Sequence, residues 1–347
     1  MDARVRKLVV AVLLSALLSG ACDLQPSARP TAAARITCAP LALSSPSTPI
    51  STGKIRFSGI VRNAQTCAAV TKVQVAAYEA QGGALTISSI DFATTDVSGL
   101  FALVVPSGQY RILFIPPAGS GLASRWWIHE LSYLRATPLD GERAGLDMLL
   151  PQGFTISGNV ITDTGAPLQA GVVVSPATDY YDWVTATSTD GRGHYTTTVP
   201  AGDFRLHFLT GPPWASQWWD NRSSHDEADD VIVAKDVTDI SVMLRPGRIV
   251  SGRVTYSDSR PAEGALAFAM LPTTTRWCCE FAGTAYTDSD GRFRIALPEG
   301  TYRVGFAFDD GEGRLYALWW PGSGTDMDRS SPVVVDRDRN DLDLELP

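Results

Sequence analysis

One pattern recurs three times along this chain of 347 residues, at a spacing of about 95 residues. Each copy begins with an apolar phrase centred on a glycine (57–61, 156–160 and 250–254). A Thr-Asp turn follows (95–101, 189–195 and 287–293), and then a Pro-x-Gly-x-aromatic-Arg phrase (106–111, 200–205 and 298–303). A tryptophan pair and an alternating segment that ends at a proline (146–151, 240–246 and 342–347) close each copy. A chain that repeats in this way is expected to fold as tandem copies of one structural unit.

The segments inside each copy alternate between apolar and other residues with a period of two. In residues 302–308, Tyr302, Val304, Phe306 and Phe308 fall on one face of such a segment. Gly, Pro, Asp and Ser interrupt the segments at intervals of about 8–12 residues, which is typical of β-sandwiches. No stretch after residue 22 sustains a helical period. We therefore predict an all-β protein of three tandem antiparallel Greek-key β-sandwiches, each with about seven strands.

The repeat also predicts the domain boundaries. We assign repeat 1 to residues 54–151, repeat 2 to 152–247 and repeat 3 to 248–347. Only a Pro-Gln-Gly (151–153) and a Pro-Gly-Arg (246–248) separate the copies. Because these linkers are so short, we expect neighbouring sandwiches to abut and to form a stiff, elongated string.

The N-terminal residues have the features of an export signal. Arg4, Arg6 and Lys7 precede an apolar run, and small residues follow at 19–21. This predicts a cleaved signal peptide over residues 1–21. Cys22 after Leu17-Leu18-Ser-Gly-Ala resembles the acylated cysteine of a bacterial lipoprotein, although Ser19 occupies the usual leucine position. We expect a lipid-anchored protein of the cell envelope, with ordinary cleavage to a secreted or periplasmic product as the alternative.

Residues 22–53 are rich in Ala, Ser, Thr and Pro and show no hydrophobic period. They predict a semi-extended tether between the acylated cysteine and repeat 1.

Charge and composition disfavour several functions. The formal net charge is −8, and it becomes −10 when residues 1–21 are removed. Arginines are scattered and form no basic stripe, which argues against nucleic-acid binding. The four histidines follow neither a catalytic nor a metal-ligand pattern, and no nucleophile motif occurs. We predict no catalytic residue, no cofactor and no metal site, and thus a non-enzymatic protein.

Taken together, the ordered landmarks resemble the carboxypeptidase regulatory-like repeat. The resemblance covers about residues 54–347. It implies a transthyretin-like (prealbumin-like) sandwich, grouped among carbohydrate-binding-like and Ig-like folds and related to the B-type repeats of collagen adhesins. Many B-type repeats carry a Lys–Asn cross-link. Only Lys54 with Asp147 offers a comparable pair here, and we expect no cross-link because repeats 2 and 3 lack the lysine. The resemblance does not define an activity.

The tryptophan pairs are the main candidate binding residues. They are Trp126-Trp127, Trp218-Trp219 and Trp319-Trp320. In a strand, adjacent side chains point to opposite faces, so one indole of each pair can enter the core while the other lies near solvent or under a loop. Exposed indoles would offer repeated platforms for sugar rings or for a surface protein. The alternative is that both indoles only pack a long loop against the sandwich. Trp214 could extend a platform in repeat 2.

Five cysteines remain to be placed. If Cys22 is acylated, Cys38 and Cys67 can pair and clip the tether to repeat 1. Cys278 and Cys279 are adjacent, so they form a strained vicinal bond, stay free, or bond to another chain.

Acidic turns such as Asp288-Ser-Asp290-Gly291 invite a calcium interpretation. We favour a purely structural turn, because the acidic residues change between the copies. Two functions stay open for the whole chain. One is an envelope-anchored protein that binds carbohydrate or a surface protein, and the other is a structural stalk with no ligand. An accessory of an enzyme is a third and less supported reading.

Overall fold

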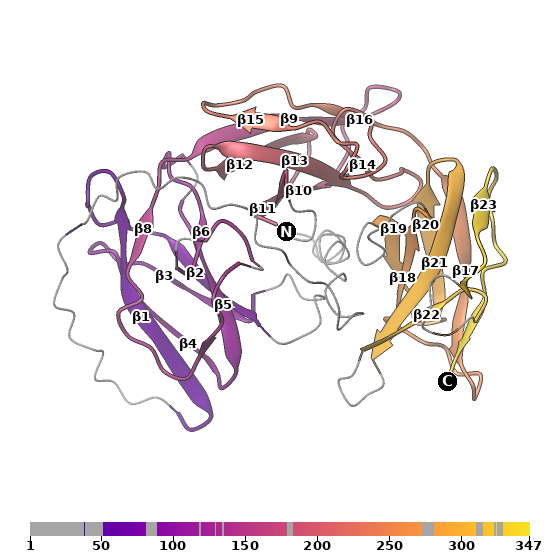
Figure 1. Cartoon of the computed structure of the whole chain (residues 1–347), viewed down its shortest axis with the longest axis horizontal. Coiled ribbons are helices and arrows are strands. Elements are labelled where there is room, and N and C mark those ends of the chain that lie inside the picture. The colour runs from indigo at the N-terminus through magenta and orange to yellow at the C-terminus, as the bar shows by residue number, and fades with distance from the viewer. Residues whose placement is uncertain are drawn as a thin grey trace.

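The computed structural model describes Cys38 and residues 51–80, 89–117, 119–128, 130–133, 135–178, 183–272, 281–309, 315–322, 324 and 329–347. Signal residues 1–21, Cys22 and most of the tether lie outside this set, as do Cys278 and Cys279. The described residues form an all-β structure of three sandwich units, and Figure 1 shows the units following one another along a bent path. This confirms the predicted fold class. No helix in the described part of the chain is long and apolar enough to cross a membrane.

Each repeat contains eight strands in the described residues, in the same order. In repeat 1 they are β1 (Lys54–Asn63), β2 (Gln74–Glu79), β3 (Asp91–Thr94), β4 (Leu100–Pro106), β5 (Gln109–Ile115), β6 (Arg125–Trp126), β7 (Leu139–Asp140) and β8 (Met148–Leu150). In repeat 2 they are β9 (Phe154–Thr162), β10 (Gly171–Pro176), β11 (Thr185–Ser188), β12 (His194–Val199), β13 (Gly202–Leu209), β14 (Gln217–Trp218), β15 (Val231–Val233) and β16 (Val242–Leu244). In repeat 3 they are β17 (Arg248–Tyr256), β18 (Leu266–Met270), β19 (Phe281–Tyr286), β20 (Arg292–Leu297), β21 (Gly300–Asp309), β22 (Leu315–Trp319), β23 (Val333–Val335) and β24 (Leu344–Leu346).

Each unit packs a small sheet against a larger one. In repeat 1 the small sheet has the order β4-β1-β8, and the larger sheet has the order β3-β2-β5-β6 with β7 also paired to β5. Repeats 2 and 3 have the same two sheets. One pairing differs from the predicted antiparallel arrangement, because the closing strand runs parallel to the first strand in every repeat. The chain therefore returns across the sandwich before it closes the small sheet.

Three separate apolar cores lie between the sheets, one in each repeat. The predicted alternation is confirmed, since Tyr302, Val304, Phe306 and Phe308 all belong to the core of repeat 3. Ile240, Val242 and Leu244 belong in the same way to the core of repeat 2. Burial of such apolar faces is the main stabilising contribution of each sandwich.

The recurring Thr-Asp turn is held by its own side chains. In repeat 3, the Asp288 carboxylate accepts hydrogen bonds from the backbone N–H groups of Asp290 and Arg292. Asp96 and Asp190 accept the equivalent pairs of bonds in repeats 1 and 2. The threonine hydroxyl accepts a backbone N–H and donates to a carbonyl in every copy. This arrangement is an Asx-type turn, which agrees with the structural interpretation of the acidic residues.

The glycine of the first phrase has a steric reason to recur. A Cβ atom at Gly59, Gly158 or Gly252 would collide with the backbone of the segment before the closing strand. Because the residue has no side chain, that segment can lie directly against the first strand. Lys54 and Asp147 lie far apart along this contact, since Lys54 opens β1 and Asp147 precedes the residue paired with Val61. They are not placed to cross-link.

The linkers are hydrogen-bonded to the repeat that precedes them. Ala123 N–H donates to the Pro151 carbonyl at 3.0 Å, and Gly153 N–H donates to the Gly121 carbonyl at 2.8 Å. After repeat 2, Ala215 and Gly247 make the matching bonds to Arg245 and Pro213. Each linker is therefore fixed to the loop that leads into the preceding tryptophan pair.

Candidate binding surface at the tryptophan pairs

The first tryptophan of each pair is fully buried. Trp126, Trp218 and Trp319 end the strands β6, β14 and β22, and their relative exposures are 0%, 1% and 2%. Each lies on the outer face of the larger sheet, away from the main core. The directly opposite residue on the neighbouring strand is Leu113, His207 or Gly305. The same indole position thus meets a different partner in each repeat.

In repeat 1, other aromatic rings cover the first tryptophan. Trp126 contacts Tyr78 at 5.2 Å, Tyr133 at 5.3 Å and Trp183 at 5.2 Å between ring centroids. Trp183 belongs to repeat 2, so this cluster crosses a domain boundary. Burial raises the pKa of Tyr78 to about 12, because the phenolate would be removed from water.

In repeat 2, two histidines enclose the first tryptophan. The imidazole of His207 stacks on Trp218 with ring centroids 4.4 Å apart, and the His225 ring makes an edge contact with the indole at 5.1 Å and 78°. Burial, and secondarily the neighbouring His225, lower the pKa of His207 to about 3. Burial also lowers the pKa of His225. Both rings are therefore neutral at physiological pH.

The tautomer of His225 follows from its partners. Arg205 can only donate, so the Nδ1 atom of His225, 3.3 Å from Arg205 Nη1, is an acceptor. The Nε2–H group then donates to the Pro176 carbonyl at 3.2 Å. The His225 backbone carbonyl accepts a second, shorter bond of 2.6 Å from Arg205. The imidazole is held as a structural bridge between two strands and a loop.

In repeat 3, phenylalanine rings surround the first tryptophan. Trp319 meets Phe268 at 5.3 Å and 84°, and Phe268 packs on Phe281 at 4.9 Å. The Phe268 ring occupies the space above Gly305, where a Cβ atom would lie only 2.5 Å from the ring. The first tryptophan is thus surrounded by tyrosine and tryptophan rings in repeat 1, by imidazoles in repeat 2 and by phenylalanine rings in repeat 3. A ligand site repeated three times would keep the same chemistry, and these surroundings do not.

The second tryptophan of each pair is half-buried and packs on the main core. Trp127, Trp219 and Trp320 border the apolar cores of repeats 1, 2 and 3. Their backbone N–H groups donate to the carbonyls of Ile112, Leu206 and Val304 at 2.9 Å in every repeat. Alternation therefore separates the two indoles as predicted, but the outward one is the more deeply buried, because a loop or a neighbouring domain covers it.

Trp214 has a local role at the next linker. It is half-buried, packs on the core of repeat 2, and forms a β-bridge with Pro246. Leu122 forms the corresponding bridge with Gln152 in repeat 1. The position four residues before the pair thus joins the loop to the linker, and in repeat 2 it is occupied by tryptophan.

The arginine of the Pro-x-Gly-x-aromatic-Arg phrase fixes the loop that follows the pair. Arg111 Nε donates to the Ala136 carbonyl at 3.0 Å, and Arg303 Nη1 donates to the Ser330 carbonyl at 2.6 Å. Arg205 makes the equivalent bond to His225 and a second one to Asp230 at 2.7 Å. The repeated phrase predicted a turn, but it did not indicate this contact, which joins residues 20 or more positions apart.

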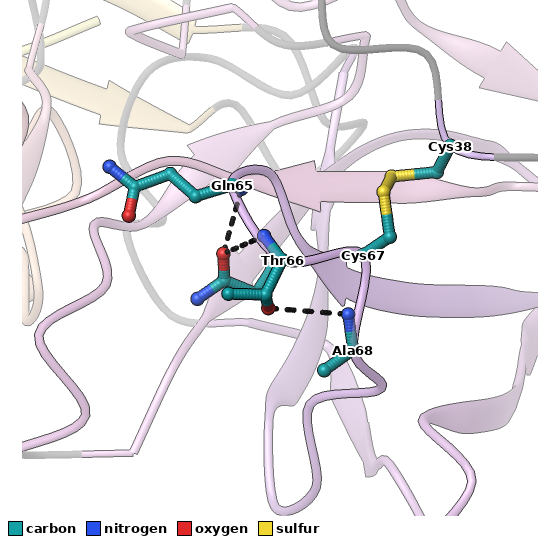
Figure 2. The surroundings of a disulfide bond; sticks show 6 residues. Cys38, Gln65, Thr66, Cys67 and Ala68 are labelled. Carbon is teal, nitrogen blue, oxygen red and sulfur yellow. Dashed lines mark hydrogen bonds between the residues drawn. A yellow bond between two sulfur atoms is a disulfide. The ribbon is translucent and has the colours of Figure 1, made fainter.

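Cys38 and Cys67 form a disulfide with an S–S distance of 2.04 Å. Figure 2 shows Cys67 in the turn after β1, where the Asn63 side chain accepts the N–H groups of Gln65 and Thr66. This is the pairing that the cysteine positions suggested, and it attaches one residue of the tether region to repeat 1. Among the described residues, no group of three or more His, Cys, Asp or Glu side chains is arranged to hold a metal ion.

Several residues around the pairs were missed at the level of sequence. Tyr78, Tyr133, Trp183 and the two buried histidines are not repeat landmarks. An imidazole on the apolar face of a strand was the only available signal for His207.

Comparisons with known proteins add little about function. No protein-family model matches the chain. No curated protein matches it.

Among solved structures, a streptococcal ancillary pilin has a TM-score of 0.26 at 12% identity, over 85% of this chain and 99% of that one. The Bacillus anthracis TIE protein has a TM-score of 0.24 at 10% identity, over 85% of this chain and 51% of its own, so this chain spans about half of its length. The shaft pilin SpaA of Lactobacillus rhamnosus GG has a TM-score of 0.23 at 11% identity, over 57% and 98%. Values this low carry no conclusion about activity or partner.

Proposed function

We propose that this chain is a non-enzymatic spacer of the cell envelope, in which the tryptophan pairs stabilise the sandwiches. One observation carries the proposal: the first indole of every pair is fully buried, and the second packs against a main core. The other recurring residues also have roles within the fold, as turn acceptors, as glycines at close contacts and as loop-fixing arginines. What the three copies share is what the sandwich needs.

Export is part of this proposal. We assign residues 1–21 to a signal peptide and Cys22 to lipid acylation, with residues 23–53 as the tether next to the membrane. The Cys38–Cys67 disulfide supports an oxidising compartment, because such bonds rarely persist in the cytosol. Mass spectrometry of the purified N-terminus tests this directly: a diacylglycerol adduct on Cys22 is expected, and an unmodified Cys22 refutes the anchor.

We propose that the three repeats are related to the carboxypeptidase regulatory-like repeats, because their sequence landmarks follow the same order. Adhesion is the second candidate function. It is favoured by one observation, that Trp127, Trp219 and Trp320 keep part of their surface accessible at the same place in each repeat. Partial indole surfaces spaced regularly along a chain can bind sugar rings through avidity.

A glycan array and a panel of purified cell-wall polymers separate the two functions. The chain is tested with Cys22→Ser, which prevents acylation, alongside the triple variant Trp127→Ala, Trp219→Ala and Trp320→Ala. The matched control is Ile232→Ala, which removes an exposed apolar side chain away from the pairs. The spacer proposal expects no binding by any form. A glycan bound by the parent and the control but not by the triple variant overturns it in favour of adhesion.

A further inference from the structure

The larger sheets of repeats 1 and 2 turn their outer faces toward each other. A single apolar cluster contains residues from both repeats, and its buried members are Ala76, Tyr78, Leu113, Trp126, Ala136, Val173, Trp183 and Leu209. The first five belong to repeat 1 and the last three to repeat 2. Alternation explains why these residues are available, because their strand neighbours Val75, Ile112 and Val172 point into the main cores instead.

Trp183 is the residue of repeat 2 that enters the aromatic surface of repeat 1. Its ring lies 5.2 Å from Trp126 at 86°, 6.0 Å from Tyr78 at 70°, and 6.3 Å from Tyr133 at 16°. Edge-to-face and stacked pairs of this kind stabilise beyond the area that they bury. The Tyr133 N–H group also donates to the Trp183 carbonyl at 3.4 Å. Trp183 belongs to this shared cluster and not to the main core of repeat 2.

Repeat 1 holds its side of the contact rigid. The Tyr133 hydroxyl donates to the Glu79 carbonyl at 2.7 Å, and the Arg111 guanidinium lies 4.6 Å from the centre of the Tyr133 ring. Leu131, from the same loop, packs against the core of repeat 2. The loop after the first tryptophan pair is therefore fixed to both domains.

The linker at this joint is closely packed. A Cβ atom at Gly153 would lie 2.5 Å from the Thr198 side chain and 2.7 Å from the Ala123 nitrogen, so the glycine is enclosed by both repeats. The linker and the aromatic cluster are thus two separate contacts between repeats 1 and 2, and two contacts restrict rotation more than one does.

Within the described residues, no such shared cluster occurs at the joint between repeats 2 and 3. Its linker has the matching backbone bonds at Ala215 and Gly247. The apolar clusters of repeat 3, as far as the chain is described, contain residues of repeat 3 alone. The positions equivalent to Tyr78 are Ser175 in repeat 2 and Met270 in repeat 3, so the ring that receives Trp183 is not part of the repeated pattern.

We propose that repeats 1 and 2 form one cooperative and mechanically rigid unit, locked by Trp183 in the aromatic surface of repeat 1, whereas repeat 3 unfolds on its own. The proposal deepens the spacer function and rests on it for its biological use, since the lock would keep two of the three spacer repeats in one fixed arrangement. Its physical content does not depend on whether any indole binds a ligand.

Thermal unfolding of the chain carrying Cys22→Ser tests the lock, with hydrogen-exchange mass spectrometry assigning each transition to a repeat. The parent is expected to show one shared transition for repeats 1 and 2 and another for repeat 3. Trp183→Ala is expected to split the shared transition, because it removes the aromatic contact between repeats 1 and 2 and leaves both main cores unchanged. The matched control is Phe208→Leu in the main core of repeat 2, which is expected to lower the shared transition as a whole.

A double-mutant cycle between Tyr78→Ala and Trp183→Ala gives a second and independent measure. Coupling across the boundary is expected to change the unfolding equilibrium constant by about 2- to 10-fold relative to additivity. Separate transitions of repeats 1 and 2 in the parent, or additive effects in the cycle, overturn the lock. Neither result bears on glycan binding, so failure of the lock and failure of the spacer function are distinguishable.

Discussion

The imidazole of His207 lies parallel to the indole of Trp218, with ring centroids 4.4 Å apart and planes inclined by 8°. His207 is buried, and its Nδ1 atom has no hydrogen-bond partner within the described part of the chain. The equivalent residue in repeat 1 is Leu113, which shows that the sandwich itself does not require a histidine here.

We expect the burial of His207 to make repeat 2 sensitive to acid. Burial lowers the pKa of His207 from 6.5 to about 3, so between these pH values the unfolded chain binds one proton more than the folded chain. The free energy of unfolding has its full value above pH 6.5 and decreases as the pH falls toward 3. We expect a loss of about 2 kcal/mol in the free energy of unfolding between pH 6.5 and 5. The depressed pKa of His225 acts in the same direction.

Urea unfolding at several pH values measures this effect. His207→Leu is expected to remove most of the loss, and the exposed His194→Leu serves as the matched control that keeps it. An unchanged pH slope in His207→Leu would show that the buried imidazole is not its source.

The glycine of the Thr-Asp turn is expected to tolerate no side chain. Gly193 has a φ of +75°, and a Cβ atom there would lie 2.5 Å from the Val160 carbonyl oxygen. Gly165 has a similar φ of +82° but open space around it. We expect Gly165→Ala to destabilise repeat 2 by about 1 kcal/mol through backbone strain alone, and Gly193→Ala by about 2–4 kcal/mol. Chemical denaturation of both variants gives the comparison, and equal losses would contradict the role of the close contact.

Replacement of the loop-fixing arginine is expected to lower the stability of repeat 2 and to loosen the loop after the tryptophan pair. Arg205 donates to the His225 carbonyl and to Asp230, and Arg205→Met keeps the aliphatic stem while removing both bonds. We expect a loss of about 2 kcal/mol, together with faster proteolytic cleavage of residues 220–230. The exposed Arg192→Met is the matched control. Cleavage at the same rate in both variants would exclude the proposed fixation of the loop.

The disulfide is expected to stabilise the unit that contains repeat 1, and not repeat 3. It joins residues separated by 29 positions, and constraint of the unfolded chain over such a loop contributes up to about 3–4 kcal/mol. The double variant Cys38→Ser and Cys67→Ser should lower the shared transition of repeats 1 and 2, as measured under non-reducing conditions, while repeat 3 unfolds as before. Alkylation of both thiols in the untreated exported protein would instead show that the bond does not form.

Features carried by short-range contacts were predictable from the sequence. The acceptor bonds of Asp288 span two and four residues, and the alternation in residues 302–308 needs only the period of a strand. The repeat itself then predicted three β-sandwiches, because five ordered landmarks in each copy describe one structural unit. These properties depend on neighbours along the chain, which the sequence states directly.

The sequence by itself thus determined the all-β class, the threefold repeat and the chemistry of the turns. Only the tertiary structure decided that the closing strand runs parallel to the first, that the outward tryptophan is the buried one, and that Trp183 joins two repeats. Each of these depends on contacts between residues dozens of positions apart. A periodic pattern specifies which face of a strand is apolar, but not which distant surface comes to cover it.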